Sequence, residues 1–250
     1  MAKKRFDLEN NIQDGEIFNW DQNEIDKVLR DKPWRRDPHH FKHVKISDLA
    51  LIKMVMHTKS GGDLEVMGYM QGFPKGETLY VQDAFALPVE GTETRVNAGD
   101  EANLYTINYT EAGQRVHRYE NVVGWYHSHP GYGCWLSGID VSTQKSMQMI
   151  QDPCVAIVVD PFRTMSSGKV ELGCFRTYKD DYAEEQKASV SLKGGAAMPG
   201  DKFDEFGLHA HKYYKVEHSF YKSSMNTELL ERIWLEYWQH TLSSSPLLSN

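Results

Sequence analysis

Two histidines and one aspartate at short spacing give this sequence the residue types of a metal site. His127 and His129 are two positions apart, and Asp140 follows His129 by eleven residues. Side chains two apart on an extended backbone point to the same side, and Pro130 holds His129 in an extended conformation. Two imidazoles and one carboxylate are a ligand set typical of catalytic zinc, with the fourth position left for water. The pattern therefore predicts one zinc ion per chain.

Two further residues could supply acid–base chemistry. Glu65 stands among apolar neighbours, where an unpaired buried carboxylate would be costly, and a metal-bound water would give it a partner. Glu65 could then act as the base that passes a proton to the leaving amine. Ser137 could hydrogen-bond the oxyanion of a tetrahedral intermediate. The alternatives are a loop hydroxyl or helix cap for Ser137 and a helix N-cap for Asp140.

Other candidate ligands lack this context. The pair His209-Ala210-His211 has no aspartate behind it at the same spacing, and we interpret it as surface histidines, like His39 and His40. Cys134 would close the site as a fourth protein ligand, so we expect it to be a neighbour of the site. The sequence contains neither the Pro-Cys-x-x-Cys segment of zinc deaminases nor the His-Glu-x-x-His helix of zincins.

The elements that must position these residues alternate between strand and helix. A short strand over Val44–Ile46 precedes a helix that Ser47 or Asp48 caps and Gly61-Gly62 ends. A hairpin is expected over 64–72 and 78–86, with Glu65 in its first strand. The other predicted elements are helices near 100–113, over 140–151 and over 226–240, and strands over 121–127, 154–159, 169–178 and 214–220. This order favours an α/β sheet with helices on both faces.

The chain divides into four parts by composition. Residues 1–40 are polar and predict an irregular N-terminal arm, and we expect 41–178 to form the domain that carries the candidate metal ligands. Within that domain, we expect 90–121 to be an insertion or lid segment. We expect 179–202 to be a linker and 203–250 to be a strand and a helix that pack on the domain.

Composition excludes several classes of protein. The chain has 250 residues, with 28 basic against 35 acidic side chains, which argues against nucleic acid as the main partner. Its longest apolar run is too short for a membrane helix, and the polar N-terminus does not resemble a secretion signal. We therefore expect the protein in the cytoplasm and nucleus, with its three cysteines as free thiols.

The motif residues together resemble a known family. Glu65, His127-Ser128-His129-Pro130, Ser137 and Asp140 are similar to the JAMM motif of active MPN-domain proteases. The similarity is strong over about 30–180 and recognisable over 203–245. It implies the MPN fold, which is cytidine-deaminase-like, with a mixed β-sheet flanked by helices and a C-terminal strand–helix extension. It also implies zinc held by His127, His129 and Asp140, with Glu65 and Ser137 as catalytic residues.

The stretches 64–68, 85–97 and 124–144 resemble the family members that work in the COP-nine signalosome. This resemblance implies a zinc isopeptidase that removes a ubiquitin-like modifier from cullin, with other signalosome subunits, especially an MPN-domain protein, as partners. A deubiquitinase acting on ubiquitin chains is the alternative enzyme, and only residues 90–97 argue against it. A metal-free MPN scaffold is the alternative outside the enzyme class. Arg95 is a candidate regulatory residue that could pair with Asp140 in competition with the metal, although a solvated loop arginine is equally compatible with its position.

Overall fold

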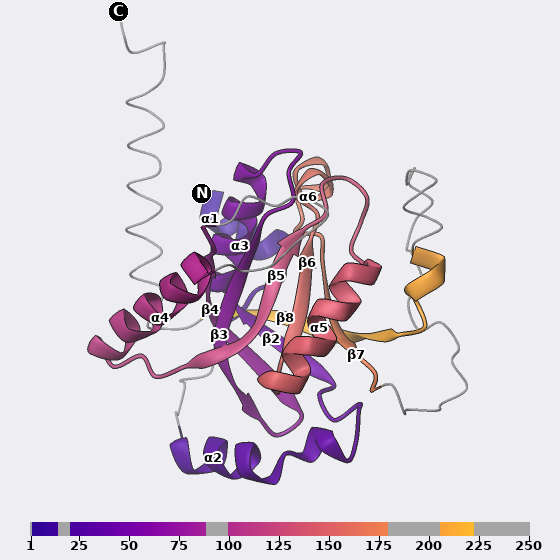
Figure 1. Cartoon of the computed structure of the whole chain (residues 1–250). Helices are drawn as coiled ribbons and strands as arrows, with labels where there is room; N and C mark the ends of the chain where they lie inside the picture. The colour runs from indigo at the N-terminus through magenta and orange to yellow at the C-terminus, as the bar shows by residue number, and fades with distance from the viewer. Residues whose placement is uncertain (1, 15–20, 89–99, 180–205, 223–250) are drawn as a thin grey trace, which may run out of the picture.

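The computed structural model describes residues 2–14, 21–88, 100–179 and 206–222, which form a sheet with helices on both faces (Figure 1). The helices are α1 (Ala2–Glu9), α2 (Gln22–Asp31), α3 (Asp48–Ser60), α4 (Asp100–Arg115), α5 (Gly138–Ile150) and α6 (Pro161–Ser167), with a 3-10 turn, η1 (Pro33–Arg35). The strands are β1 (Gln13–Asp14), β2 (His43–Ser47), β3 (Met67–Lys75), β4 (Thr78–Ala86), β5 (Asn121–Ser128), β6 (Val155–Val159), β7 (Leu172–Thr177) and β8 (Tyr213–Lys222). The predicted α/β class is confirmed.

The sheet is mixed and closes on itself. Its order is β1-β8-β2-β4-β3-β5-β6-β7, with β3 antiparallel to both neighbours and β5 parallel to β6. β8 pairs in parallel with β2 through residues 217–221 and antiparallel with β7 through residues 213–216. One strand from the far end of the described chain therefore joins the two sides of the sheet.

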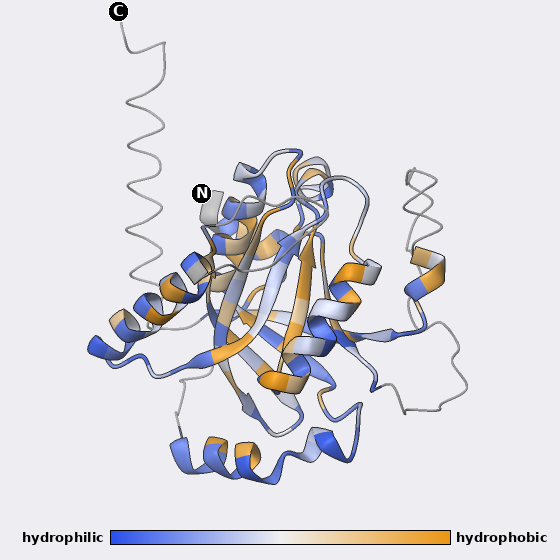
Figure 2. Cartoon of the chain, in the orientation of Figure 1, coloured by the Kyte–Doolittle hydropathy of each residue, from blue (hydrophilic) through white to orange (hydrophobic). Residues whose placement is uncertain are grey.

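The two faces of the sheet carry separate apolar cores. Tyr126 belongs to the core that α3 covers, together with Leu51 and Met54, whereas Trp125 belongs to the core under α5, together with Val141. β6 is buried along its whole length between these cores, and its apolar residues stand out in Figure 2. Since side chains alternate along a strand, His127 shares the α5 face with Trp125.

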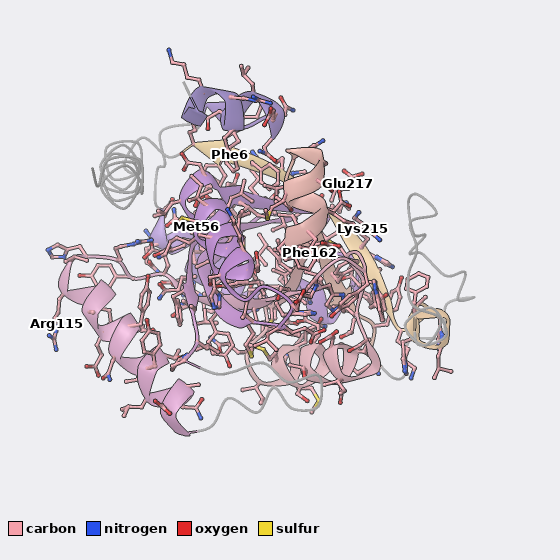
Figure 3. All side chains as sticks on the ribbon, turned by 90° about the horizontal axis from the view of Figure 1, so that it is seen from above. Phe6, Met56, Arg115, Phe162, Lys215 and Glu217 are labelled. Atoms are coloured by element: carbon pink, nitrogen blue, oxygen red, sulfur yellow. The ribbon has the colours of Figure 1, made fainter. Side chains whose placement is uncertain are left out.

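Helix α3 forms as its end signals predict. The Ser47 hydroxyl accepts a hydrogen bond from Ala50 N at 3.0 Å, and Gly61 ends the helix. Of its apolar residues, Leu51 and Ile52 are buried, but Met56 is 46% exposed. Figure 3 shows α6, with Phe162, beside α3, with which it is in contact.

Helix α4 packs beside the sheet. Tyr109 stacks on Phe85 of β4 with ring centroids 4.2 Å apart, and its hydroxyl donates to Asp83 at 2.9 Å. Asp83 also binds Lys53 of α3 and Arg118. This buried carboxylate therefore anchors the described part of the predicted 90–121 insertion, whose outer end at Arg115 points away from the sheet in Figure 3.

The prediction of an irregular arm over residues 1–40 is wrong for the part that the structure describes. The Asp21 side chain caps α2, where Ile25 is buried and Val28 and Leu29 pack against the core. Trp34 of η1 is also buried. Three apolar residues at i, i+3 and i+4 are enough to dock a short helix, and the polar residues around them hide this stripe in the sequence.

Two strand boundaries also differ from the prediction. β3 begins at Met67 because residues 61–64 form a turn, closed by Leu64 N donating to Gly61 O at 3.0 Å, so Glu65 lies just before the strand. β7 begins at Leu172, after α6, a helix that we did not predict; Asp160 caps α6 and Gly168 ends it. Val170, Leu172 and Cys174, at alternate positions of the predicted strand over 169–178, all belong to one core.

Several predictions fall outside the described residues. These are Arg95, most of the linker over 179–202 and the final helix over 226–240. The domain boundaries stay predictions. Among the described helices, none combines the length and apolar character needed to span a membrane.

Candidate metal centre

His127 comes from the end of β5, between β3 and β6. It pairs in register with Met67 on one side and Val158 on the other, and the residue is 3% exposed. Its ring stacks on that of Trp125, with centroids 4.7 Å apart and an interplanar angle of 15°. The neighbour two positions earlier on the strand therefore sets the orientation of this imidazole.

His129 follows the strand and is held by the backbone on both sides. Its amide donates to Val159 O at 2.9 Å, and its Nδ1 lies 3.1 Å from Gly133 O. A carbonyl only accepts hydrogen bonds, so Nδ1 carries the proton. Nε2 of His129 is therefore unprotonated, and its lone pair points toward His127 and Asp140.

Asp140 is placed by the first turn of α5. Its Oδ2 accepts hydrogen bonds from Ser137 N at 2.8 Å and Ser137 Oγ at 2.7 Å, while Asp140 N donates to Ser137 Oγ at 3.2 Å. This is a capping box in which Ser137 is the N-cap and Asp140 the third helical residue. The cap interpretation thus holds for Ser137 and is wrong for Asp140.

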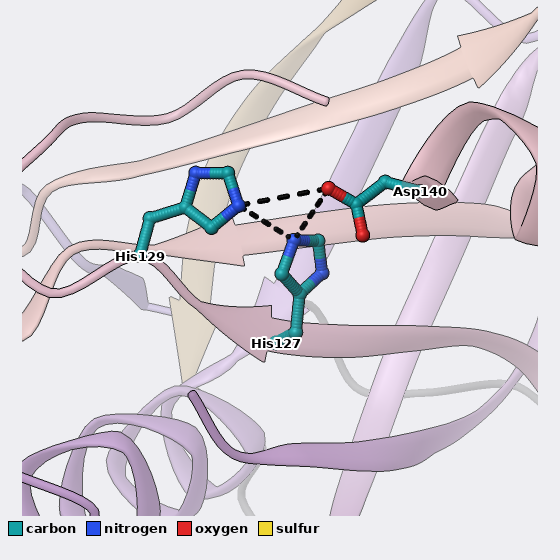
Figure 4. A group of neighbouring side chains, drawn as sticks. All are labelled: His127, His129 and Asp140. Carbon is teal, nitrogen blue, oxygen red and sulfur yellow. Dashed lines mark hydrogen bonds and ion pairs between the residues drawn. The ribbon is translucent and has the colours of Figure 1, made fainter. Parts of the chain in front are cut away.

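The three side chains converge on one point (Figure 4). His127 Nε2 lies 3.1 Å from His129 Nε2 and 3.4 Å from Asp140 Oδ2, and His129 Nε2 lies 3.6 Å from the same oxygen. Four ligands around zinc at about 2.0–2.1 Å stand about 3.3 Å from one another, so these separations suit a tetrahedral zinc ion. Of all described residues, these three make up the group of histidine, cysteine and acidic side chains that could hold a metal ion.

The electrostatics of this group call for a cation between its members. Burial alone would lower the pKa of His127, but the carboxylates of Asp140 and Glu65 together outweigh burial and raise that pKa above its ordinary value. Burial alone would raise the pKa of Asp140, but the two histidines hold it well below its ordinary value. Three acceptor atoms within 3.6 Å of one another repel unless a proton or a metal ion joins them. The donor set therefore fits a divalent metal.

The raised pKa of His127 predicts how metal binding depends on pH. Zinc and the proton compete for the same nitrogen, so affinity is full above the pKa of His127 in the folded protein and falls as the pH drops through it. Because the pKa of His127 is raised above the ordinary histidine value of about 6.5, zinc affinity should begin to fall above that pH. Below the pKa, the affinity should drop by about tenfold per pH unit. Competition with a chelator between about pH 8 and pH 5 measures this dependence. A constant affinity over that range would contradict ligation by His127.

Glu65 reaches the rim of the site through its neighbours. Val66 N donates to Ser128 Oγ at 2.9 Å, and Ser128 N donates to Val66 O at 3.0 Å, which ties this segment to the end of β5. The Tyr132 hydroxyl donates to Glu65 Oε1. The Tyr132 ring in turn lies 4.6 Å from that of His129 between centroids. Glu65 therefore stands beside the three converging side chains with one of its oxygens already hydrogen-bonded.

The structure places the remaining candidates away from ligand positions. Burial raises the pKa of the Cys134 thiol, whose Sγ lies 3.6 Å from Glu171 O, and Cys134 does not belong to the described group that could hold a metal ion. His209 and His211 are half-buried instead of exposed, and a Cβ at Gly138 would lie 2.7 Å from His209 Nε2. Arg95 lies outside the described residues.

Sequence reasoning missed the residues that orient the ligands. Trp125 Nε1 donates to Gln144 Oε1 at 2.8 Å, and Gln144 Nε2 donates to Cys154 O at 3.0 Å. Gln144 is one helical turn after Asp140 and fully buried, so it fixes α5 against the strand that carries His127. The spacing of four from Asp140 was a signal for Gln144. Nothing in the sequence indicates the contact between Tyr132 and Glu65.

Comparisons with known proteins cover the same residues. A profile of the family described as JAB1/Mov34/MPN/PAD-1 ubiquitin protease matches residues 39–153. The chain is 53% identical over 254 residues to COP9 signalosome complex subunit 5 of Gibberella zeae, covering 100% of this chain and 74% of that relative. The protein of the same name from Dictyostelium discoideum is 51% identical over 252 residues, covering 100% of this chain and 75% of that relative. The one from Drosophila melanogaster is 53% identical over 253 residues, covering 100% of this chain and 76% of that relative. All these matches span Glu65 and the three converging side chains.

Proposed function

The chain belongs to the JAB1/Mov34/MPN/PAD-1 ubiquitin protease family, which confirms the resemblance drawn from its motifs, and on that premise we propose that it is a zinc-dependent isopeptidase. Its substrate is a ubiquitin-like modifier joined to a lysine side chain. The observation that carries this proposal is the triangle of His127 Nε2, His129 Nε2 and Asp140 Oδ2, with edges of 3.1–3.6 Å.

These three residues would hold the metal. When bound, zinc supplies a Lewis acid that polarises a carbonyl and lowers the pKa of water to about 7. The side chains are buried and held by neighbours on the strand, the loop and the helix, so little reorganisation is needed before the ion enters. A preorganised ligand set of this kind suits a site that must keep one position open for reactants.

Glu65 is the general base and then the general acid in this proposal. Its carboxylate takes a proton from the attacking water. The oxygen of that water bonds at the same time to the carbonyl carbon of the modifier's C-terminal glycine. The same proton then passes to the lysine nitrogen as the C–N bond breaks, leaving a carboxylate and a free amine. The Tyr132 hydroxyl bound to Oε1 holds the carboxylate at the rim, so Oε2 is the oxygen directed to this transfer.

Ser137 has two tasks in this scheme. Its hydroxyl donates to Asp140 Oδ2 at 2.7 Å, which orients a proposed ligand. To stabilise the oxyanion of the tetrahedral intermediate, the hydroxyl would turn from Asp140 toward the carbonyl oxygen. Ser137 N still donates to Asp140 in that state, so the carboxylate keeps one hydrogen bond.

We assign the substrate to the cullin branch of the ubiquitin-like pathway. The relatives are named as subunits of the COP9 signalosome, and the sequence similarity extends over the whole described chain. The modifier conjugated to cullin is then the substrate, and other signalosome subunits, including an MPN-domain protein, are the partners. A deubiquitinase acting on ubiquitin chains remains the alternative within the same chemistry.

The test combines metal analysis with two substrates. The purified chain, alone and mixed with signalosome subunits, is assayed on modifier-conjugated cullin and on ubiquitin chains. We expect about one zinc per chain, cleavage of the cullin conjugate, loss of cleavage on chelation and recovery on adding zinc. Preference for ubiquitin chains would support the deubiquitinase. Assembly with partner subunits without zinc or cleavage would support the metal-free scaffold.

A further inference from the structure

A buried carboxylate that the proposed chemistry does not use lies behind the metal centre. Asp160 follows β6 directly and is fully buried. It caps α6 by accepting a hydrogen bond from Arg163 N at 3.0 Å, and its own amide donates to Glu171 O at 3.0 Å. A helix of seven residues does not by itself require a fully buried charged cap, so the remaining contacts of Asp160 decide its role.

Those contacts reach into the loop between His129 and Asp140. Gly131 N donates to Asp160 Oδ1 at 3.0 Å, and Gly133 N donates to Asp160 Oδ2 at 2.9 Å. Arg163 Nε also lies 3.2 Å from Oδ2. One side chain therefore joins the loop after His129 to the start of α6, with both oxygens occupied by backbone donors.

The backbone of this loop is shaped for the carboxylate. Gly131 and Gly133 both have φ of 87°, a conformation that residues with a Cβ rarely adopt. A Cβ at Gly133 would also lie 2.9 Å from the Arg163 side chain. Loop amides turned toward one point form an anion-binding concavity, and here the anion is Asp160 of the same chain.

The loop that Asp160 binds is also hydrogen-bonded to a proposed metal ligand, His129. Gly133 N is bound to Asp160, and Gly133 O accepts from His129 Nδ1 at 3.1 Å. That hydrogen bond keeps the proton on Nδ1 and leaves Nε2 as the ligand atom. The His129 amide is bound to Val159 O, the residue before Asp160. The same short segment thus fixes both the backbone and the ring of His129.

We infer that Asp160 is a positioning residue of the metal centre, because it holds the Gly131–Gly133 loop so that Gly133 O fixes the tautomer and direction of the His129 ring. This inference rests on the proposed zinc site. It assigns Asp160 no contact with metal or substrate.

Asparagine separates this role from helix capping. An Asn side chain caps a helix about as well as Asp, and its oxygen can still accept from Arg163 N and Gly131 N. Its NH₂ group would replace Oδ2 and face two donors, Gly133 N and Arg163 Nε. Asp160→Asn should therefore release the Gly133 peptide while α6 stays capped. Asp160→Ser is a second variant, since serine also caps helices but is too short to reach both loop amides.

The matched control lies at the other end of β6. Asp152 accepts from Cys154 N at 2.9 Å and pairs with the buried Arg176 at 2.9 Å, so it binds one backbone amide and an arginine, whereas Asp160 binds three backbone amides and an arginine. Asp152→Asn should lower the thermal midpoint and leave the hydrogen bond from His129 Nδ1 to Gly133 O in place. This variant therefore measures how much a loss of stability alone weakens zinc binding.

The experiment measures zinc affinity by chelator competition and the His129 tautomer by ¹⁵N NMR of the zinc-free protein. For Asp160→Asn and Asp160→Ser we expect about tenfold or greater weakening of zinc binding, and a His129 ring that samples both tautomers. For Asp152→Asn we expect zinc affinity within about twofold of the unmodified chain and a single Nδ1–H tautomer.

Two results would overturn the inference. One is zinc affinity and a His129 tautomer in Asp160→Asn that match the unmodified chain. The other is equal weakening in Asp152→Asn and Asp160→Asn, which would trace the loss to stability. If the unmodified chain binds no zinc, the proposed function itself fails, and this outcome is separate because it needs no variant.

Discussion

His127→Ala should weaken zinc binding by about a hundredfold or more and abolish measurable isopeptide cleavage. Zinc sites with four protein ligands bind with about 10–16 kcal/mol, so one ligand carries on the order of 3 kcal/mol. The site offers three protein ligands, and the loss of one leaves His129 and Asp140 without the partner that lies 3.1 Å and 3.4 Å from them. Zinc content after dialysis and single-turnover cleavage measure both effects.

The fold should survive this change. His127 stacks on Trp125 at one end of the α5 core, and the sheet pairing of β5 uses only its backbone. The matched control is His57→Ala, which removes a half-buried imidazole from the other face of the sheet, where Nδ1 lies 2.9 Å from the Tyr126 hydroxyl. That variant should keep its zinc. Retention of full zinc content by His127→Ala would remove His127 from the ligand set.

Glu65→Gln should keep the metal and lower the cleavage rate by a factor of about 10²–10⁴. The amide has the shape of the carboxylate, and its oxygen can still accept the hydrogen bond from the Tyr132 hydroxyl, so the side chain stays at the rim. It cannot accept a proton at neutral pH, and the transfer from water to the leaving nitrogen is lost. The measurement is the cleavage rate at equal zinc occupancy.

The control for this variant is Glu77→Gln, which changes an exposed carboxylate paired with Lys42 at the hairpin turn. It should cleave at the unmodified rate. Turnover of Glu65→Gln near that of the unmodified chain would show that another group accepts the proton. A loss of zinc in Glu65→Gln would instead indicate that Glu65 takes part in metal binding.

Local patterns in the sequence predicted the parts of the molecule that depend on local physics. Alternation along β5 placed His127 on one face, and the Ser47 and Gly61 signals gave the ends of α3. The convergence of His127 and His129 with Asp140 could be expected from the motif. The geometry of that convergence depends on where α5 lies against β5, which the motif does not specify.

What the sequence did not predict depends on contacts between distant residues. Tyr132 and Glu65 are 67 positions apart, and Asp160 is 27 positions from Gly133, so no periodicity links them. Gln144 carried a usable signal in its spacing from Asp140, but a buried glutamine is recognisable only once its partner Trp125 is known. The stripe of α2 was missed because three apolar residues among polar ones resemble a loop.

The closure of the sheet by β8 has a consequence for how the protein is made. During synthesis, the ribosome has added all the proposed catalytic residues once it reaches Asp140. Strands β2 and β7, however, both pair with β8, which begins only at Tyr213. Until then a nascent chain on the ribosome exposes two strand edges that can pair with other chains. Tyr213 also accepts a hydrogen bond from Leu136 N at 3.2 Å, in the loop before Asp140. The loop before Asp140 therefore reaches its final hydrogen bonding only after the last described strand is available, and we expect chains that end before Tyr213 to aggregate more readily than the full chain.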